Sequence, residues 1–296
     1  MDMKTSSNRS KAYKVFSMIL LIVLAVLFLF PLYWIVTGAF KTGQDIYSTT
    51  PVWIPSEWTM GNFTKLFDRR SAPLFEIGAL VGPTVPGAVR WLVNTVFMAV
   101  AAMLLTCLTA AMAGYALAKK RFIGRAILFS LIVCAMALPK QVILIPLLKE
   151  MSALRLYDTL WAVIFPTVGW PFGVFLMKQF SEGIPDEILE AARVDGASEW
   201  RTFSTIVLPM VKPGIGALAI FTFINSWNDY FMQLVMLASN SRYTISLGIS
   251  TMQAETSVDT GLLMAGATLA AVPIIVVFLV FQKYFTQGIT MGAVKG

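Results

Sequence analysis

The chain alternates between long apolar stretches and shorter polar segments. Six stretches are long enough to cross about 30 Å of hydrocarbon, which takes a helix of about 20 apolar residues. They cover residues 15–40, 91–118, 126–148, 159–180, 213–238 and 262–285. The pattern predicts an all-α membrane protein with six transmembrane helices in a single transmembrane domain over residues 1–296. The first stretch is too long for a signal-peptide core and no small-residue cleavage site follows it, so we expect a retained helix.

Composition narrows the function. Of the 296 residues 57% are hydrophobic, 13% are charged and none is His, which excludes a soluble or disordered chain. The lack of His removes the commonest general base and metal ligand, and Cys107 and Cys134 alone cannot make a zinc site. We therefore expect no metal site and no catalytic residue. In the second stretch, Ala110, Ala111, Ala113 and Gly114 make a small-residue face that suits close helix packing.

Lys and Arg predict the orientation, because short cytoplasmic segments carry the excess of positive charge. The net charge of +7 is therefore interpreted as a topology signal rather than as a nucleic-acid-binding surface. Fourteen of these residues fall on one predicted side: Lys4, Arg9, Lys11, Lys14, Lys119, Lys120, Arg121, Arg125, Lys178, Arg193, Arg201, Lys212, Lys283 and Lys295. Eight fall on the other side: Lys41, Lys65, Arg69, Arg70, Arg90, Lys149, Arg155 and Arg242. We expect both termini in the cytoplasm, and outside it a loop over residues 41–90 with short helices at the interface.

Proline and glycine interrupt two of the predicted spans. The third span contains Pro139 and Pro146, and the fourth contains Pro166, Gly169, Trp170, Pro171 and Gly173. Non-helical backbone at membrane depth is tolerated where protein or a water-filled cavity satisfies it, so a cavity is one interpretation. Ordinary proline kinking is the other.

Two ionisable side chains lie inside predicted spans. Lys140 falls about 21 Å and Asp229 about 25 Å along helices that run in the same direction, at 1.5 Å per residue. Because charges at this depth are costly, we expect the two side chains to pair or to line an outer cavity together. The alternative is that each reaches the interface alone.

Aromatic and amide side chains surround Asp229. Asn225, Trp227 and Asn228, with Trp170 in the fourth span, are side chains that can grip a sugar, since rings stack on C–H faces and polar groups bond hydroxyls. Together with Lys140 they are candidates for a translocation pathway. The same residues could instead belt the interface or join helices.

A polar segment over residues 183–201 predicts two short helices in the cytoplasm. Pro185 suits a first helical position, Gly196 fits a helix stop and Ser198 can cap the next helix. Six acidic side chains between Glu182 and Glu199 disfavour an anionic leaflet and favour a protein socket. Spacing predicts a common face for Ile188, Ala191 and Ala192.

This segment carries a resemblance to a known family. Glu190-Ala191-Ala192, Gly196 and Ile206-x-Leu208-Pro209 resemble the EAA motif of permease subunits of binding-protein-dependent ABC importers. The likeness extends to Asn94-Thr95 and the C-terminal segment 287–296, and is strongest to the MalG-like subunits of the carbohydrate branch. It implies the type I ABC importer permease fold, and the chain looks most like subunits for pectin-derived (rhamnogalacturonan) oligosaccharides.

The resemblance also implies partners: a second, MalF-like permease, two cytoplasmic ATPase subunits, a solute-binding protein outside and membrane lipid. ATP and Mg would belong to the ATPases, since the chain lacks a G-x-x-x-x-G-K-[ST] loop; no cofactor is expected in this chain, which would not be an enzyme. In the loop 181–209 it assigns ATPase coupling to these residues: Ile188, Glu190, Ala191, Ala192, Asp195, Gly196, Leu208 and Pro209. The tail 287–296 would contact the ATPases through Gln287, Gly288 and Lys295, and the binding protein would meet Gln253, Glu255 and Asp259.

We therefore expect a multi-pass subunit of an oligosaccharide importer in a bacterial cell membrane, switched between two access states by its ATPases. A stand-alone secondary transporter is one alternative, although six spans are few and inverted repeats are not evident. An intramembrane enzyme is the other, and the absence of His disfavours it.

Overall fold

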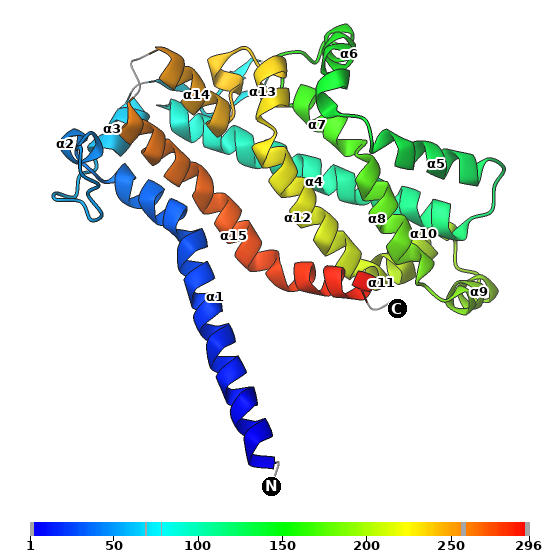
Figure 1. The fold of residues 1–296 in the computed structure, drawn as a ribbon. Helices are drawn as coiled ribbons and strands as arrows, with labels where there is room; N and C mark the ends of the chain where they lie inside the picture. Colours follow the sequence, from blue (N-terminus) through cyan, green and yellow to red (C-terminus); the bar gives the residue numbers. More distant parts are fainter. Residues whose placement is uncertain (1–2, 69, 78, 256–258, 294–296) are drawn as a thin grey trace. The chain divides into compact units, whose positions relative to one another are not determined.

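The computed structural model describes residues 3–68, 70–77, 79–255 and 259–293 (Figure 1). The chain forms two compact units, residues 1–69 with 253–269 and residues 70–252 with 270–296. The prediction of a single transmembrane domain over residues 1–296 stays a prediction. So do its three segments, the outer loop 41–90, the coupling loop 181–209 and the C-terminal tail 287–296.

The first unit contains a long apolar helix, two short helices and the first part of a fourth helix. The helices are α1 (Met3–Ala39), α2 (Gly43–Ile46), α3 (Gly61–Asp68) and the start of α15 (Thr260–Ala293). Buried Asn62 closes the end of α1, because its Nδ2 donates to the carbonyl oxygens of Ala39 at 3.0 Å and Lys41 at 2.9 Å. From Tyr13 to Phe30 the side chains of α1 are almost all exposed and apolar, as expected of a helix that faces lipid or another membrane subunit.

The second unit is built around α4 (Gly87–Lys119). Helices α7 (Trp161–Val168), α8 (Pro171–Glu182) and α12 (Lys212–Asn228) pack against it. The predicted small-residue face is confirmed, since Ala110 and Ala111 are buried and a Cβ built on Gly114 would lie 2.6 Å from the backbone of Met177 and Lys178. Only glycine lets α4 and α8 approach this closely.

Three of the predicted spans are not continuous helices, and one of them is the fourth, which divides into α7 and α8 at Gly169 and Trp170. The third is α5 (Arg125–Ala135) and α6 (Lys140–Ala153), bent by 106°. Pro139 accounts for this break, because it lacks an N–H and disfavours helical backbone at the preceding residue. The fifth is interrupted at Asp229, after which α13 (Tyr230–Met236) begins.

The predicted number of spans depends on these bends. Among the residues that the structure describes, four helices are long and apolar enough to cross a membrane, and up to six if each bent pair counts as one span. The other bent pair joins residues 199–210 to α12 at 77°. It contains α10 (Glu199–Thr202), a π-helix (Phe203–Val207) and α11 (Leu208–Met210).

The loop predicted over residues 41–90 contains strands as well as short helices. One hairpin pairs β1 (Ser71–Pro73) with β4 (Thr84–Pro86), and a smaller one pairs β2 (Glu76–Ile77) with β3 (Leu80–Val81). These strands of two or three residues are too short to show a periodic pattern, so the sequence predicted only helices here. The remaining elements are α9 (Asp186–Val194), a 3₁₀ turn (Asn240–Arg242) and α14 (Ile245–Glu255).

Candidate functional site

Helix α9 carries four of the candidate coupling residues and ends where predicted, but it begins one residue after Pro185, which was predicted at the first helical position. Pro185 precedes its first turn, where Asp186 and Glu187 face the positive end of the helix dipole. Gly196 follows with φ +72°. Its N–H donates to the Arg193 carbonyl at 3.0 Å, and the N–H of Ala197 donates to the Ala192 carbonyl at 3.0 Å. This is the glycine-terminated helix end that the sequence predicts.

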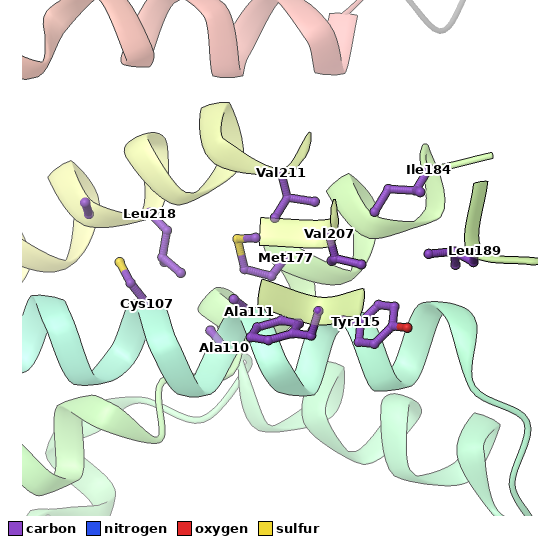
Figure 2. Close-up of a cluster of buried hydrophobic side chains, with 12 residues drawn as sticks. Cys107, Ala110, Ala111, Tyr115, Met177, Ile184, Leu189, Val207, Val211 and Leu218 are labelled. Atoms are coloured by element: carbon purple, nitrogen blue, oxygen red, sulfur yellow. The ribbon is translucent and has the colours of Figure 1, made fainter. Parts of the chain in front are cut away.

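The common face predicted for Ile188, Ala191 and Ala192 is only partly exposed. Leu189 and Ala192, one turn apart, are buried, and Leu189 joins the hydrophobic cluster that includes Tyr115 and Val207 (Figure 2). Ala192 therefore packs against its own chain, whereas Ile188 and Ala191, grouped with it by spacing, are exposed. The outer face has Ile188, Ala191 and Val194, of which Val194 is 87% exposed.

Two lysines at the end of α4 hold this segment. The Lys119 Nζ donates to the Ile184 carbonyl at 2.6 Å and to Asp186 Oδ1 at 2.8 Å, and Lys120 forms an ion pair with Glu199. The hydrogen bond and charge of Lys119 hold the pKa of the Asp186 carboxyl below its ordinary value. These lysines were interpreted only as topology signals, and their structural partners lie more than 60 residues away in the sequence.

The other candidate coupling residues lie on this helix, at its end and after the π-helix. Glu190 and Asp195 are exposed, as is Pro209, whereas Leu208 is partly buried against the same hydrophobic cluster. The N–H of Leu208 donates to the Phe203 carbonyl five residues back, which closes the π-helix. The following Pro209 has no N–H to give, and single π turns of this kind are frequent at functional sites.

Lys140 and Asp229 meet at two of the helix breaks of the second unit, the one between α5 and α6 and the one between α12 and α13. The Lys140 Nζ lies 3.0 Å from Asp229 Oδ2 and 3.4 Å from Asn225 Oδ1. The other carboxylate oxygen of Asp229 accepts from the N–H of Met232 at 3.4 Å and caps α13. The predicted pairing of the two charges is therefore present. Beside the pair is an open pocket that Asn228 also lines.

The two tryptophans of the candidate pathway lie elsewhere. Trp227 is 1% exposed and packs on Phe223 with ring centroids 5.4 Å apart, so it is part of the core and was wrongly placed on the pathway. Trp170 contacts Phe172 at 5.0 Å and packs against the hydrophobic cluster around Leu218. Neither residue lines the pocket beside Lys140.

Gln233 is a residue of this site that the sequence did not predict. It is fully buried, and its Nε2 donates to the carbonyl oxygens of Ser226 at 3.1 Å and Trp227 at 3.4 Å, at the end of α12. Its Oε1 accepts from the Thr244 hydroxyl. The side chain thus bonds helix-end carbonyls left open by the break at Asp229. The sequence signal that could have indicated this role is the position of Gln233, a polar residue four positions after the charged Asp229.

Asp158 fixes the far end of α13. Its Oδ1 accepts from the backbone N–H groups of Ala238 at 2.7 Å and Ser239 at 2.9 Å, and Oδ2 accepts from the Ser239 hydroxyl. Burial raises the pKa of this carboxyl, but the hydrogen bonds from Ser239 and Ala238 outweigh it and hold the pKa below the ordinary value. Asp158 also has φ +57°, an unusual value for a residue other than glycine.

We expect Asp158 to make stability depend on acid pH. Because its folded pKa is lowered, its contribution is present above the ordinary carboxyl pKa of about 3.9 and is lost as pH falls through the folded value. Asp158→Asn should lower the free energy of unfolding by about 1 kcal/mol at neutral pH. This is less than the loss of a buried hydrogen bond to a charged group would cost, because Asp158 is partly exposed. Unfolding midpoints of the detergent-solubilised importer at pH 7 and below pH 4 measure this. An equal loss for Asp158→Asn at both values would contradict it.

The candidate contacts for the binding protein are only partly described. Asp259 accepts from the N–H of Leu262 at 3.1 Å and pairs with Lys65 at 3.0 Å, so its carboxylate caps α15 and holds α3. Gln253 is partly buried on α14. The side chains of Glu255, Gln287 and the backbone of Lys295 lie outside the described residues, as do the contacts of Gly288.

Comparison with known proteins shows which protein family this chain resembles. The protein-family model described as "Binding-protein-dependent transport system inner membrane component" matches residues 108–291. The arabinooligosaccharides transport system permease protein AraQ of Halalkalibacterium halodurans is 33% identical over 92% of this chain and 93% of its own length. The maltodextrin transport system permease protein MdxG of Bacillus subtilis is 31% identical over 96% of both chains.

A solved structure has the same fold. A chain of a bacterial ABC transporter involved in the import of the acidic polysaccharide alginate superposes with a TM-score of 0.74 over 94% of this chain and 98% of that chain, at 21% identity.

Proposed function

Because this chain belongs to the family of inner membrane components of binding-protein-dependent transport systems, we propose that it is a permease subunit that imports oligosaccharides. Its role is transport rather than catalysis. The relatives named above support the substrate class, and a pectin-derived oligosaccharide is the narrower proposal. A stand-alone secondary transporter is not favoured, since the matched family supplies components of multi-subunit systems.

We propose that two cytoplasmic ATPase subunits, holding ATP and Mg, dock on the outer face of α9 and act with a second, MalF-like permease and a solute-binding protein. This places α9, α10 and both termini in the cytoplasm of a bacterial cell. Gln253, Glu255 and Asp259 would then lie outside, near the binding protein, and the tail residues Gln287, Gly288 and Lys295 near the ATPases.

The observation that carries this proposal is that α4 is clamped at both ends. At its C-terminal end Lys119 holds α9. At its N-terminal end the Asn94 amide donates to the carbonyls of Ser241 at 2.9 Å and Tyr243 at 2.8 Å, and Trp91 Nε1 donates to the Asn240 carbonyl at 3.0 Å. The helix spans 33 residues, hence about 50 Å.

A clamped helix of this length can transmit motion. Displacement of α9 by closing ATPases would move α4 as a rigid body, and with it the outer segment that bonds Gln233 and α13. Such a rigid-body shift is the proposed basis of alternating access. Lys140, Asn225, Asn228 and Asp229 lie at the helix breaks, where the pathway would open.

The proposal is tested by reconstituting the complete importer in proteoliposomes. Uptake of arabinotriose, maltotriose or digalacturonate should need ATP, the binding protein and this chain. Glu190→Lys and Gly196→Asp should abolish co-purification with the ATPase. Ion-driven uptake by the isolated chain would contradict the proposal.

Two substitutions on α9 should separate docking from folding. Val194→Asp changes a side chain that is 87% exposed, so stability should change by less than about 0.5 kcal/mol. The same change should weaken ATPase binding by about 2 kcal/mol, or about thirtyfold, because a charge enters an apolar contact. Leu189→Asp buries a charge and should prevent accumulation of the chain.

Co-purification with the ATPase and abundance in the membrane measure the two effects. If Val194→Asp binds the ATPase like the wild type, the outer face of α9 is not the docking surface.

A double-mutant cycle tests the ion pair of the pathway. Lys140→Met and Asp229→Asn should each reduce uptake, because each leaves one charge without its partner. Since Lys140 is half exposed, we expect a coupling of about 1 kcal/mol, so that the double variant transports about fivefold better than the product of the two effects. Initial uptake rates measure this, and additive effects would show that the pair is not coupled during transport.

A further inference from the structure

The turn that joins α4 to α5 presents an apolar tip. It covers residues 120–125 and lies at the same end of the second unit as α9 (Figure 1). Ile123 is fully exposed and Phe122 is 45% exposed. On the adjoining helix Ile127 and Leu131, four positions apart and hence on one face, are also exposed. An exposed apolar run of this kind marks a contact with a membrane or with another subunit.

Hydrogen bonds fix the shape of this turn. Gly124 has φ +84°, and the N–H of Arg125 donates to the Phe122 carbonyl at 3.4 Å. The Arg125 Nη1 donates to the Lys120 carbonyl at 3.2 Å and closes the turn. A guanidinium has five N–H donors, so most of those of Arg125 are left for a ligand. The tip is therefore held in one conformation with these donors beside it.

Two arginines give the turn its net positive charge. Lys119 and Lys120, at the end of α4, form ion pairs with acids of α9 and α10. Arg121 and Arg125 are exposed and form no ion pair within the part of the chain that the structure describes. Arg121 contributes, after Lys119, to the lowered pKa of the Asp186 carboxyl, but lies beyond ion-pair distance from it. The two arginines can therefore bind an anion from outside the chain.

The turn also lies at the surface of the membrane. Helix α5 starts at Arg125 and is the first half of a bent span, so the hydrocarbon begins directly after the turn. The ion pairs of Lys119 and Lys120 put the turn on the side of α9. A segment at this depth with basic and apolar side chains matches an anionic leaflet, where phosphates lie above acyl chains.

We propose that residues 120–125 bind an anionic phospholipid of the cytoplasmic leaflet, with the two arginines donating to its phosphate and the two apolar side chains among its acyl chains. The inference goes beyond the proposed function and rests on it only for the side of the membrane. Because Lys119 and Lys120 directly precede the turn, a lipid bound there also anchors the end of α4 that holds α9.

Two other coverings of the same turn give different results. If the second permease or the ATPase covers it, lipid will not reach it in the complete importer. If only its apolar side chains matter, zwitterionic and anionic lipids will reach it equally well. Quenching by labelled lipids distinguishes all three.

The test uses one fluorophore in the complete importer. In a Cys107→Ala, Cys134→Ala background that assembles like the wild type, Ile127→Cys carries a bimane one helical turn from the tip and leaves the tip itself intact. The vesicles contain phosphatidylcholine and phosphatidylglycerol at one fixed ratio, and either the first or the second lipid carries a nitroxide on its acyl chain. The difference in quenching measures the preference for the anionic lipid at this turn.

We expect a preference of about fivefold for each arginine, hence about twenty-fivefold for phosphatidylglycerol in the parent chain. Arg121→Gln and Arg125→Gln should each lower it about fivefold, and the double variant should show none. Arg201→Gln is the matched control, because Arg201 is exposed on α10 at the same end of the unit and lies outside the turn. It should leave the preference unchanged.

Equal quenching by the two lipids in the parent chain would overturn the inference. Absence of quenching by either lipid would overturn it in favour of a subunit interface. Quenching does not depend on transport, so ATP-driven uptake in the same vesicles tests the proposed function separately. A wild-type importer that takes up none of arabinotriose, maltotriose and digalacturonate would contradict the proposed function, whatever the lipid preference.

Discussion

Gln233→Leu is expected to destabilise the chain by about 3 kcal/mol. The substitution leaves the carbonyls of Ser226 and Trp227 and the hydroxyl of Thr244 without their partner, at a residue that is fully buried. An unsatisfied buried polar group costs about 1–3 kcal/mol, and leucine fills most of the volume without restoring any bond. The unfolding midpoint of the solubilised importer measures the loss.

The control is Gln282→Leu. Gln282 is exposed, and its amide bonds only the Leu279 carbonyl of its own helix, at 3.1 Å. Its replacement should change stability by less than about 0.5 kcal/mol. Equal midpoints for the two variants would show that Gln233 does not support the break at Asp229.

Gly114→Ala is expected to cost about 3 kcal/mol as well, for a steric reason. The added Cβ would lie 2.6 Å from backbone atoms of Met177 and Lys178, and backbone cannot move aside as a flexible side chain can. Forcing an extra methyl into a packed contact costs about 1–3 kcal/mol, and the upper end applies when both sides are helices. Abundance in the membrane and the unfolding midpoint should both fall.

Gly169→Ala is the matched control. Gly169 lies at the break between α7 and α8, and a Cβ there meets nothing within 4 Å. This variant should fold like the wild type. If Gly114→Ala is equally stable, the contact between α4 and α8 is looser than the structure has it.

The two sites also differ in what they do for transport. Gln233 supports the outer helix break, whereas Gly114 lies near the end of α4 that holds α9 through Lys119. A partly active Gln233 variant should therefore be impaired in uptake while its ATPase still docks. A Gly114 variant that assembles should be impaired in docking, because α8 and α9 shift together.

The sequence predicted most of what depends on local chemistry. The helix end at Gly196 follows from glycine at a positive φ, and the cap at Ser198 follows from a hydroxyl that accepts the N–H of Arg201 at 3.3 Å. The break at Pro139 follows from the missing N–H of proline. Each of these features involves residues within a few positions of one another.

Some features that depend on distant residues were missed or misplaced, although the pairing of Lys140 with Asp229 was among the alternatives that their depths suggested. Spacing grouped Ala192 with Ile188 and Ala191, because helical periodicity groups residues without saying which of them other elements cover. The inner face of α9 is covered by the hydrophobic cluster that includes Tyr115. The sequence did not indicate that this cluster lies against α9. For the same reason Trp227 looked like a pathway residue, although packing on Phe223 buries it.

Membrane residence, the absence of His and the EAA motif were thus determined by the sequence alone, since hydropathy and short spacings carry them. The tertiary structure decided which face of α9 is free, that Lys119 and Lys120 clamp it, and that Lys140 and Asp229 meet beside a pocket. These contacts join residues 67, 79 and 89 positions apart, and no local pattern encodes such a distance. They exist because a charged group in an apolar chain is stable only where packing brings its partner within reach.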